Sequence, residues 1–427
     1  MLANRWFKMI ENLQHKKLTT FQHIYRWFLR AILILYRALI LCAKCFPGKK
    51  NKVNRQLTIL VTGTFYSDHW LITHLRPMAN ANNCKSLTMV ASSKVPEMDN
   101  AIAAYAPKWL QKLTGQVSSR LIYFSWLAIK HRPDVLVGFH LLLNGLLVAL
   151  LAKIINSKSV YICGGGPREV AGGGVSTESR IFSRISQADY FIEKELLKAV
   201  NEMDLVVSMG SGAITYFKEK GVSSRFEIIP GGFDDEVFVP DPKQIKEYDL
   251  ILIGRLSGVK RVDRLLHAIK LAKQKIPTLN AVVVGDGPDK KYLQKLAEQL
   301  GISDDVNFVG WQDNVHVWLQ KSKCFVLTSD SEGLYQALIQ AMMTGLPAIT
   351  SDVGDLNDLI KNNYNGYLVS ELNPDNFSTV FTKLFKDDSL LNVFSSNALE
   401  STECFTVSNV QLHWQKIFST FSISRID

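Results

Sequence analysis

Residues 248–269, YDLILIGRLSGVKRVDRLLHAI, join a short apolar run to a glycine-punctuated turn and then to an amphipathic stretch. The run Tyr248–Ile253 is typical of a buried parallel strand, and Lys260–Ile276 has the apolar spacing of a helix. This alternation recurs through the chain, both before and after the loop-rich segment Gly231–Gln244. Alternating strands and helices predict parallel sheets with crossover helices, so we expect two doubly wound α/β domains facing a cleft.

The predicted strands are short apolar runs, rich in β-branched residues and bounded by turn residues. In the first half they are Leu57–Thr62, Ser86–Ala91, Asp134–Phe139, Ser159–Cys163, Asp204–Ser208 and Phe226–Pro230. In the second half they are Tyr248–Ile253, Leu279–Gly285, Val306–Val309, Lys323–Thr328 and Leu346–Thr350, with helices over Pro288–Leu300, Gly333–Thr344 and Asp355–Lys361. We therefore expect an N-terminal segment (1–56), a first domain (57–235), a second domain (236–405) and a helix (406–427) that packs back on the first domain.

The composition is that of a folded protein, with 427 residues, 47% hydrophobic and 21% charged. Six scattered cysteines favour a reducing compartment, and the lone Cys42-x-x-Cys45 lacks the second pair of ligands that a structural metal site needs. The formal net charge is +10, yet residues 1–56 hold twelve of the 49 Lys and Arg residues and one of the 39 acids. The rest of the chain is close to neutral, which argues against nucleic acid as a partner.

The basic N-terminal segment contains an amphipathic stretch, FQHIYRWFLRAILILYRALILCAKCFPGKK (residues 21–50). At about 100° per residue, Arg26, Arg30, Arg37 and Lys44 form one narrow cationic stripe, and apolar side chains cover the rest of the helix. This favours a helix that lies in a membrane interface, drawn through residues 20–56 to anionic lipid at the inner, cytoplasmic face of the membrane. Two other interpretations remain open: a helix docked on the protein, and a single-pass anchor, which Arg37 disfavours.

Two cations lie in the turn that follows the strand Tyr248–Ile253. Gly254 opens the turn, and Arg255 and Lys260 stand just before the predicted helix. A guanidinium and an ammonium can both reach phosphate oxygens, where they would stabilise the charge of a leaving diphosphate without a metal. The alternative is an ordinary solvated helix start.

A second polar group follows the strand Lys323–Thr328, in the sequence SDSEGLYQALIQAMMTGLP. A helix that begins at Gly333 would present the amides of Gly333 and Leu334 as an anion site at its N-terminus. On that helix Glu332 and Gln340 would share one side, where their oxygens can accept hydrogen bonds from sugar and ribose hydroxyls. The alternative is a carboxylate that caps the helix and a surface amide.

A glycine-rich segment, GGGPREVAGGG (residues 164–174), follows the strand Ser159–Cys163. It is typical of a mobile loop whose backbone can approach an acceptor closely. Arg168, near Gly165 and Gly166, is suited to meet a phosphate. A flexible connection without a binding role is the alternative.

Taken in order, these segments resemble the retaining nucleotide-sugar glycosyltransferases of the GT-B fold, family 4, also called glycosyl transferases group 1. The resemblance is strongest over about residues 225–370, through IIPGGFDDEVFVP, ILIGRLSGVKRVDRLLHAI, VVVGDGP, VNFVG, SDSEGLYQALIQAMMTGLPAITSDVGD and NNYNGYLV. Weaker matches extend to LTILVTGTF and HRPDVLVGFHLLLNGLLVALLAKI. The ordered set is far more specific than any one of its motifs.

The resemblance implies roles for residues of the second domain. Arg255 and Lys260 match the basic pair that grips the donor diphosphate. Glu332 matches the acid that binds the hydroxyls of the transferred sugar, beside the two amides that follow it. Gln340 stands where the family has the second glutamate of its Glu-x7-Glu motif, usually assigned to the ribose. A carboxamide accepts a hydrogen bond more weakly than a carboxylate, so weaker nucleotide binding is implied.

Two residues of the first domain also match the family. His140, after the strand Asp134–Phe139, matches a histidine near the reacting sugar, whereas a lone histidine is more often structural. Gly63 matches the glycine loop that approaches the donor phosphates and the acceptor. The family commonly has two adjacent glycines there, and this chain has Gly63 followed by Thr64.

The resemblance implies a hexosyl-type glycosyltransferase that uses a nucleoside diphosphate sugar, of UDP or GDP type, with retention and without a metal or other cofactor. The leaving phosphate can take the proton of the acceptor, so no protein base is required. With the basic N-terminus, this predicts a peripheral membrane enzyme of polysaccharide biosynthesis that acts on a lipid-linked or surface-glycan acceptor. The competing hypotheses are a non-catalytic homologue that binds nucleotide or glycan, and a nucleotide-sugar epimerase.

Overall fold

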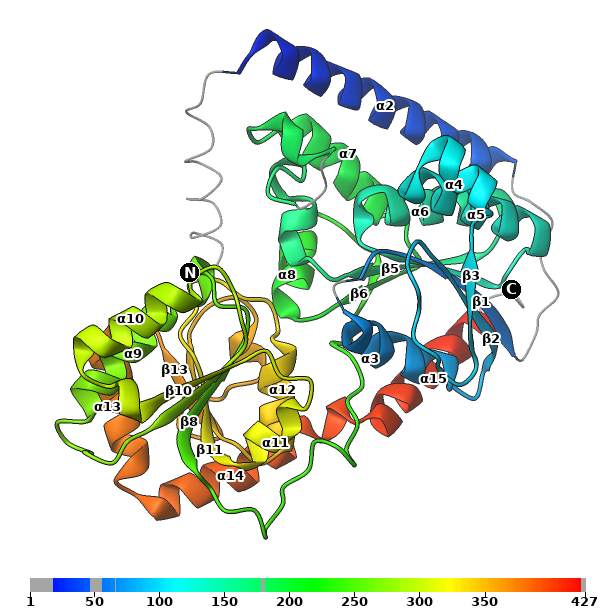
Figure 1. Cartoon of the computed structure of the whole chain (residues 1–427). Helices are drawn as coiled ribbons and strands as arrows, with labels where there is room; N and C mark the ends of the chain where they lie inside the picture. Colours follow the sequence, from blue (N-terminus) through cyan, green and yellow to red (C-terminus); the bar gives the residue numbers. More distant parts are fainter. Residues whose placement is uncertain (1–17, 47–55, 66, 178–180, 424–427) are drawn as a thin grey trace. The chain divides into compact units, whose positions relative to one another are not determined.

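The computed structural model describes residues 18–46, 56–65, 67–177 and 181–423. Its contacts divide the chain into two compact units, each built on a parallel sheet (Figure 1). Unit 1 comprises the residues up to Gly232 together with those from Val407 onward, and unit 2 runs from Phe233 to Thr406. The chain therefore passes between the units twice, and the first passage lies three residues before the expected boundary at 235/236.

Unit 1 has a seven-stranded sheet in the order β3-β2-β1-β4-β5-β6-β7, with parallel pairing throughout. The strands are β1 (Leu57–Thr62), β2 (Cys84–Ala91), β3 (Ala101–Tyr105), β4 (Val135–Phe139), β5 (Lys158–Cys163), β6 (Leu205–Ser208) and β7 (Arg225–Ile228). The strand order changes direction between β1 and β4. Their carboxyl ends therefore form the switch point at which folds of this kind bind ligands.

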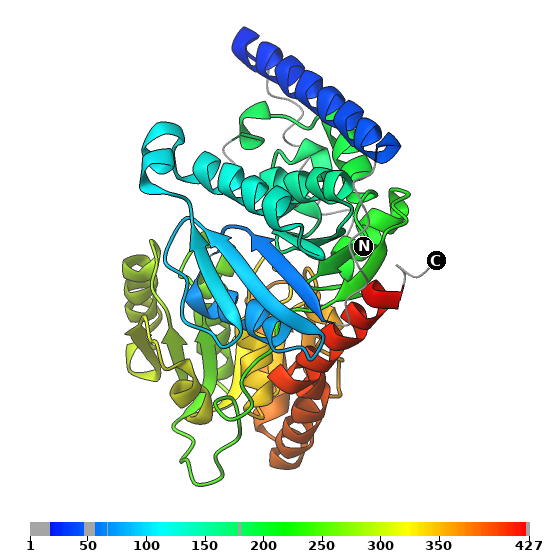
Figure 2. The same ribbon diagram turned by 90° about the vertical axis from the view of Figure 1, so that its right-hand side faces the viewer.

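Helices cover both faces of this sheet (Figures 1 and 2). On one face α3 (Asp68–Ala79) packs against α15 (Val407–Ile423), whose Trp414, Ile417 and Phe418 join the core beside β1. The other face is covered by α5 (Gln116–His131), α6 (Leu146–Ile155), α7 (Tyr190–Val200) and α8 (Ser211–Glu219), and the short α4 (Lys108–Thr114) precedes α5. Burial on both faces explains why the central strands read as unbroken apolar runs.

Unit 2 has a six-stranded parallel sheet in the order β10-β9-β8-β11-β12-β13. The strands are β8 (Tyr248–Ile253), β9 (Ala281–Val284), β10 (Val306–Gly310), β11 (Ser322–Leu327), β12 (Ala348–Ser351) and β13 (Gly366–Val369). The helices are α9 (Val262–Ala272), α10 (Lys290–Leu300), α11 (Val315–Gln320), α12 (Gln336–Met343), α13 (Pro374–Phe385) and α14 (Asp388–Thr402). The switch point of this sheet lies between β8 and β11. Two Rossmann-like domains, as the sequence predicted, are confirmed.

Four elements differ from the sequence prediction. The edge strands β3 and β13 were not predicted, and β3 has the weakly apolar sequence AIAAY with no fully buried residue. The helix expected over Asp355–Lys361 is a single 3-10 turn, Leu356–Asp358. The helix expected from Gly333 begins only at Gln336.

The N-terminal helix α2 (Thr20–Cys45) packs on α6 and α7 of unit 1. Its cationic stripe points toward the protein. Arg26 and Arg30 each come within 2.9 Å of the Asp189 carboxylate. Arg37 lies 3.8 Å from Glu195 and Lys44 lies 2.6 Å from Glu202. The described part of this segment is therefore docked on the protein, and the charges expected at a lipid surface are paired with acids of unit 1.

The opposite side of α2 is apolar and exposed. It carries Phe21, Ile24, Phe28, Ile32, Leu35 and Leu39, and Trp27 beside them is 70% exposed. Among the described residues, no helix combines the length and apolar content that a membrane span requires. The helix thus turns its cations inward, together with the buried Leu29, Leu33 and Ile40, and leaves a second apolar side exposed.

Candidate active site

Unit 2 places Gly254 and Tyr335 together at the carboxyl end of β8. A Cβ atom on Gly254 would lie 2.6 Å from the Tyr335 hydroxyl. That hydroxyl donates a hydrogen bond to the carbonyl oxygen of Ile253 at 3.0 Å, and burial raises the pKa of Tyr335 above its ordinary value. The glycine therefore allows the Tyr335 ring to close against the end of the strand.

Lys260 and Glu332 form an ion pair on this ring. The Lys260 Nζ atom lies 2.6 Å from Oε1 of Glu332 and 3.9 Å from the centre of the Tyr335 ring. The two side chains are largely buried, with 13% and 8% of their surface exposed. Arg255 is exposed and makes no hydrogen bond or ion pair to any residue that the structure describes. Three of the predicted donor-binding side chains thus lie on one edge of the sheet, and Arg255 is available to an anion.

The loop that carries Glu332 is fixed from both sides. The buried Arg264 donates to the carbonyl oxygen of Thr328 at 2.5 Å and to the Asp330 carboxylate at 2.7 Å. On the other side Gly354 approaches so closely that a Cβ atom would lie 1.7 Å from the carbonyl oxygen of Glu332. Because Gly354 also has a φ of +60°, only glycine fits there without displacing the loop.

Gly333 and Leu334 precede α12 and do not open it. Their backbone amides donate to no residue that the structure describes, and Gly333 is exposed. These two amides therefore have no partner among the described residues, and they lie outside the first turn of the helix where the sequence analysis placed them. Because Glu332 also lies outside the helix, the helical projection that put it on one side with Gln340 does not apply. Gln340 is 5% exposed, so the alternative of a surface amide is wrong.

In unit 1, Gly63 follows β1 and is backed by a buried arginine. The carbonyl oxygen of Gly63 accepts a hydrogen bond from Arg120, whose other terminal nitrogen donates to Oδ1 of Asn144 at 3.0 Å. Arg120 is 1% exposed, and burial lowers its pKa to about 10. A Cβ atom on Gly63 would lie 2.6 Å from the Cβ atom of Phe139. The predicted glycine loop is thus held by a cation that the sequence analysis did not identify.

His140 follows β4, at the other side of the same switch point. Its φ is +62°, which is uncommon for a residue other than glycine. Its ring lies nearly parallel to that of Trp70, with the ring centres 6.4 Å apart, and its Nδ1 atom lies 2.9 Å from Oε1 of Glu169. Gly63 and His140 therefore stand at the ends of adjacent parallel strands.

The glycine-rich segment is compact, in contrast to the mobile loop that was expected. It forms two 3-10 turns, Gly166–Glu169 and Ala171–Gly173, and residues 169–175 are buried. Arg168 is exposed, and its Nε atom donates to the carbonyl oxygen of Gly165 at 2.9 Å. The Arg168 side chain is thus partly engaged by its own turn.

The sequence analysis did not single out Tyr335, Arg120 or Glu169 for the site. Their partners are distant in the chain, by 82, 57 and 29 residues respectively. Tyr335 and Glu169 lie inside two of the sequence motifs quoted above. Their position beside the predicted site residues could therefore have identified them as candidates. Arg120 carried only a weak signal, a cation directly before the mostly apolar stretch of α5.

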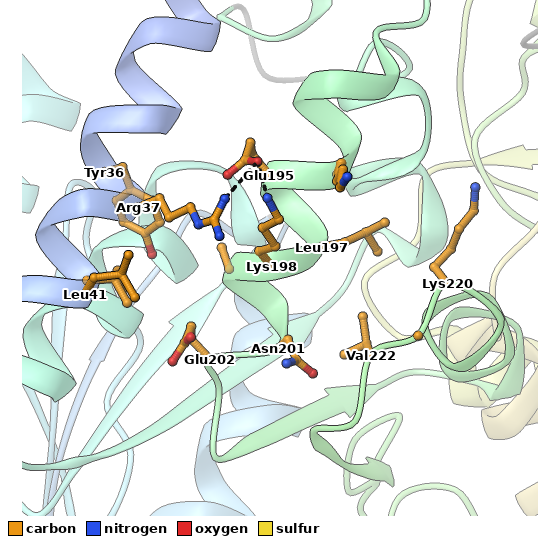
Figure 3. Close-up of a pocket in the computed structure, with 14 residues that line it drawn as sticks. Tyr36, Arg37, Leu41, Glu195, Leu197, Lys198, Asn201, Glu202, Lys220 and Val222 are labelled. Carbon is orange, nitrogen blue, oxygen red and sulfur yellow. Dashed lines mark hydrogen bonds and ion pairs between the residues drawn. The ribbon is translucent and has the colours of Figure 1, made fainter. Parts of the chain in front are cut away.

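A separate cavity of about 360 Å³ lies between α2 and α7 (Figure 3). Arg37, Lys198 and Glu195 line it, and the two cations both approach the same carboxylate. None of its lining residues is among those predicted to bind the donor or the reacting sugar. Elsewhere, no three His, Cys, Asp or Glu side chains of the described residues form a group that could hold a metal.

Comparisons with known proteins show which family the second unit resembles. Residues 234–401, nearly all of unit 2, match the family model of the glycosyl transferases group 1. An uncharacterized glycosyltransferase of Haemophilus influenzae is 25% identical over 222 residues, which are 51% of this chain and 62% of that protein. The UDP-Gal:alpha-D-GlcNAc-diphosphoundecaprenol alpha-1,3-galactosyltransferase of Escherichia coli is 30% identical over 189 residues, 40% of this chain and 48% of that enzyme. Each match thus spans less than two thirds of the relative.

The likeness in structure extends over both units. The crystal structure of Anabaena Alr3699/HepE in complex with UDP has a TM-score of 0.64 to this chain at 17% identity. The superposition covers 85% of this chain and 100% of that one. Residues 234–401 thus match the glycosyl transferases group 1, and the chain has the GT-B fold.

Proposed function

We propose that the protein transfers a hexosyl-type sugar from a nucleoside diphosphate sugar to a lipid-linked or surface-glycan acceptor at the cytosolic face of the membrane. The transfer proceeds with retention of anomeric configuration and without a metal ion. The observation that carries the proposal is the cluster of Lys260, Glu332 and Arg255 at the end of β8. UDP in the Anabaena structure supports a UDP-type donor, with GDP as the alternative.

In the described state Lys260 and Glu332 satisfy each other. A donor diphosphate would attract the Lys260 ammonium and the Arg255 guanidinium, because charge-assisted hydrogen bonds to phosphate are strong. Glu332 would then accept hydrogen bonds from the hydroxyls of the transferred sugar, and the amides of Gly333 and Leu334 would donate to its oxygens or to phosphate. The donor thus replaces an internal ion pair with interactions of the same kind.

In the proposed reaction the bond between the anomeric carbon and the phosphate oxygen breaks, and the acceptor oxygen bonds to the same face of that carbon. The leaving diphosphate takes the proton of the acceptor, so the protein supplies no base. Lys260 and Arg255 stabilise the charge on the leaving group. His140 and Gly63 serve the reacting sugar and the acceptor, by their match to the family.

The membrane part of the proposal rests on the outer side of α2. An exposed apolar helix face of this length, with Phe21, Trp27 and Phe28 near one end, suits the boundary between lipid headgroups and acyl chains. The acceptor in the name of the Escherichia coli relative is linked to a diphosphoundecaprenol, a lipid. We therefore propose that the apolar side of α2, and not its cationic stripe, meets the bilayer.

Donor binding is tested by the thermal stability of the full chain with millimolar UDP, GDP, ADP or CMP. A nucleotide at about 100 times its Kd adds roughly 2.7 kcal/mol. Sugars of the nucleotide that binds are then tested for transfer to a polyprenyl-diphosphate-linked sugar, with EDTA present, and the product is examined by NMR for its anomeric configuration. Inversion, or a need for metal, would contradict the mechanism, and a change in the donor without an acceptor would indicate an epimerase.

Membrane binding is tested by flotation of the full chain with liposomes that contain anionic lipid. Trp27→Glu should weaken binding by at least about fivefold, because it places a charge in the lipid-facing side. Trp311→Glu is the matched control, since Trp311 of unit 2 is 72% exposed and Trp27 is 70% exposed. Equal binding by both variants would refute the proposed lipid surface.

Gln340 favours a second candidate, a homologue that binds nucleotide or glycan without turnover. The residue is buried on α12, where a carboxylate of the family is replaced by a carboxamide. Nucleotide binding without transfer would support this candidate. In that case Gln340→Glu should tighten nucleotide binding, whereas failure to do so would remove its motivation.

A further inference from the structure

The Glu169 carboxylate is buried at the centre of unit 1 and accepts four hydrogen bonds. Glu169 itself is 4% exposed. Its Oε1 atom accepts from the amide of Gly165 at 2.6 Å and lies 2.9 Å from Nδ1 of His140. Its Oε2 atom accepts from the amide of Leu141 at 2.6 Å and from the Tyr161 hydroxyl at 2.9 Å. One side chain thus joins the end of β4, the strand β5 and the glycine-rich segment.

The partners of Glu169 decide its charge. Two are backbone amides, which can only donate, and Tyr161 donates its hydroxyl proton. Burial by itself would raise the pKa of Glu169, but His140 and the amides of Leu141 and Gly165 outweigh it, so the pKa lies below its ordinary value. The carboxyl group is therefore ionised and acts as an acceptor at all four contacts.

Because Glu169 is ionised, it determines which nitrogen of the His140 ring carries a proton. Nδ1 of His140 must carry a hydrogen to bond Oε1 of Glu169. In the neutral ring Nε2 is then the nitrogen with the lone pair, and in the charged ring it is a second donor. His74 of α3 interacts electrostatically with this ring, and His74 stays neutral because burial lowers its pKa to about 4.

The glycine-rich segment packs closely against the His140 ring and the Glu169 carboxylate. A Cβ atom on Gly164 would lie 3.1 Å from Cε1 of His140, and one on Gly165 would lie 2.8 Å from Oε1 of Glu169. The glycines therefore allow the chain to pass against both side chains. Glu169 also binds the amide of Leu141, the residue after His140. This hydrogen bond supports the His140 backbone in its positive-φ conformation.

We propose that Glu169 is the positioning residue of His140: it fixes the Nδ1-protonated form and the place of the ring, and it ties both to the glycine-rich segment. The proposal rests on the proposed function, in which His140 serves the reacting sugar. It gives the glycine-rich segment a role as the backbone frame of a buried carboxylate. It also means that Nε2 is the atom with which His140 meets a sugar hydroxyl.

The direct test is NMR of the full chain with 15N-labelled histidine, with the His140 signals assigned by their loss in His140→Gln. We expect the Nδ1-protonated form in the wild-type protein, and in Glu169→Gln a mixture with the Nε2-protonated form. An Nε2-protonated His140 in the wild-type protein would overturn the proposal. This readout does not depend on transfer activity, so it separates failure of this proposal from failure of the proposed function.

Kinetics show whether Glu169 acts through His140. Glu169→Gln should lower kcat by at least about tenfold with little change in the Kd for the nucleotide. In a His140→Gln background the same substitution should cause less than about a threefold further loss, because the two act as a unit. Equal losses in both backgrounds would overturn the proposal. Tyr161→Phe is the matched control, because it removes one hydrogen bond from Glu169 and leaves His140 its partner, so kcat should change by less than about threefold.

Discussion

The ion pair between Lys260 and Glu332 predicts that only the loss of Lys260 weakens nucleotide binding. Each side chain is a predicted ligand of the donor, and in the described state each occupies the other, at 2.6 Å. UDP carries the diphosphate but no transferred sugar. Lys260→Met should therefore weaken UDP binding about tenfold or more, because it removes a charge-assisted contact of about 1.5–3 kcal/mol. Glu332→Gln should leave UDP binding unchanged or strengthen it, because it releases the ammonium for the phosphate.

Transfer should respond differently from binding. Both single variants should lower kcat/KM for the sugar nucleotide by at least about tenfold, since Glu332 is needed once the sugar is present. Each should also destabilise the free protein by about 1.5–3 kcal/mol, because it leaves a largely buried charge without its partner. The double variant should lose at least about 1 kcal/mol less stability than the two single variants lose together.

The measurements are calorimetric titration with UDP, initial rates with the sugar nucleotide, and urea unfolding of the four proteins. Lys273→Met is the matched control, since Lys273 also lies 2.6 Å from a carboxylate, that of Asp305, but is not a predicted ligand. It should leave UDP binding and transfer unchanged. If Glu332→Gln weakened UDP binding as much as Lys260→Met does, the reasoning about the shared pair would be refuted.

Three further predictions concern the packing of the two units. Gly254→Ala should destabilise unit 2 by about 1–3 kcal/mol through its clash with the Tyr335 hydroxyl, and Tyr335→Phe should restore much of that loss in urea unfolding. Because burial lowers the pKa of His74 to about 4, the unfolded chain binds its proton first as the pH falls. The contribution of His74 is therefore complete above about pH 6.5 and declines toward pH 4 by up to roughly 3 kcal/mol, a decline that urea midpoints should show in the wild type but not in His74→Gln. Asp189→Asn removes the carboxylate that binds Arg26 and a second arginine, so amide hydrogen exchange in α2 should accelerate at least about tenfold; unchanged exchange would contradict this role.

The sequence predicted the buried strands well because a strand covered on both faces must be apolar at nearly every position. β1 and β8 have the bounds that were expected. The same reasoning explains the failures at the sheet edges. β3 is only partly covered, so its sequence carries no such run, and β13 is four residues long. The bounds of edge strands depend on neighbours that a local pattern does not contain.

The site was predicted from motifs, and its supporting residues were missed. Lys260 and Glu332 are 72 residues apart, and the resemblance placed both at one ligand. The start of α12 was placed too early because the spacing of apolar residues cannot tell a helix from an extended approach to it. The sequence also could not show which way the cationic stripe of α2 points. Its acidic partners, Asp189 and Glu195, are far from it in the sequence. Amphipathicity shows that a helix has two sides, but the charge of its neighbours decides which side faces them.

The two passages of the chain between the units set an order of events during synthesis. Strand β1 leaves the ribosome early, but the residues of α15 that close the core beside it, Trp414, Ile417 and Phe418, follow only after the whole of unit 2. Unit 2, by contrast, is continuous in the sequence. The nascent chain can therefore complete its second domain first. Until α15 is made, the apolar surface beside β1 that α15 covers stays exposed and can bind other apolar surfaces.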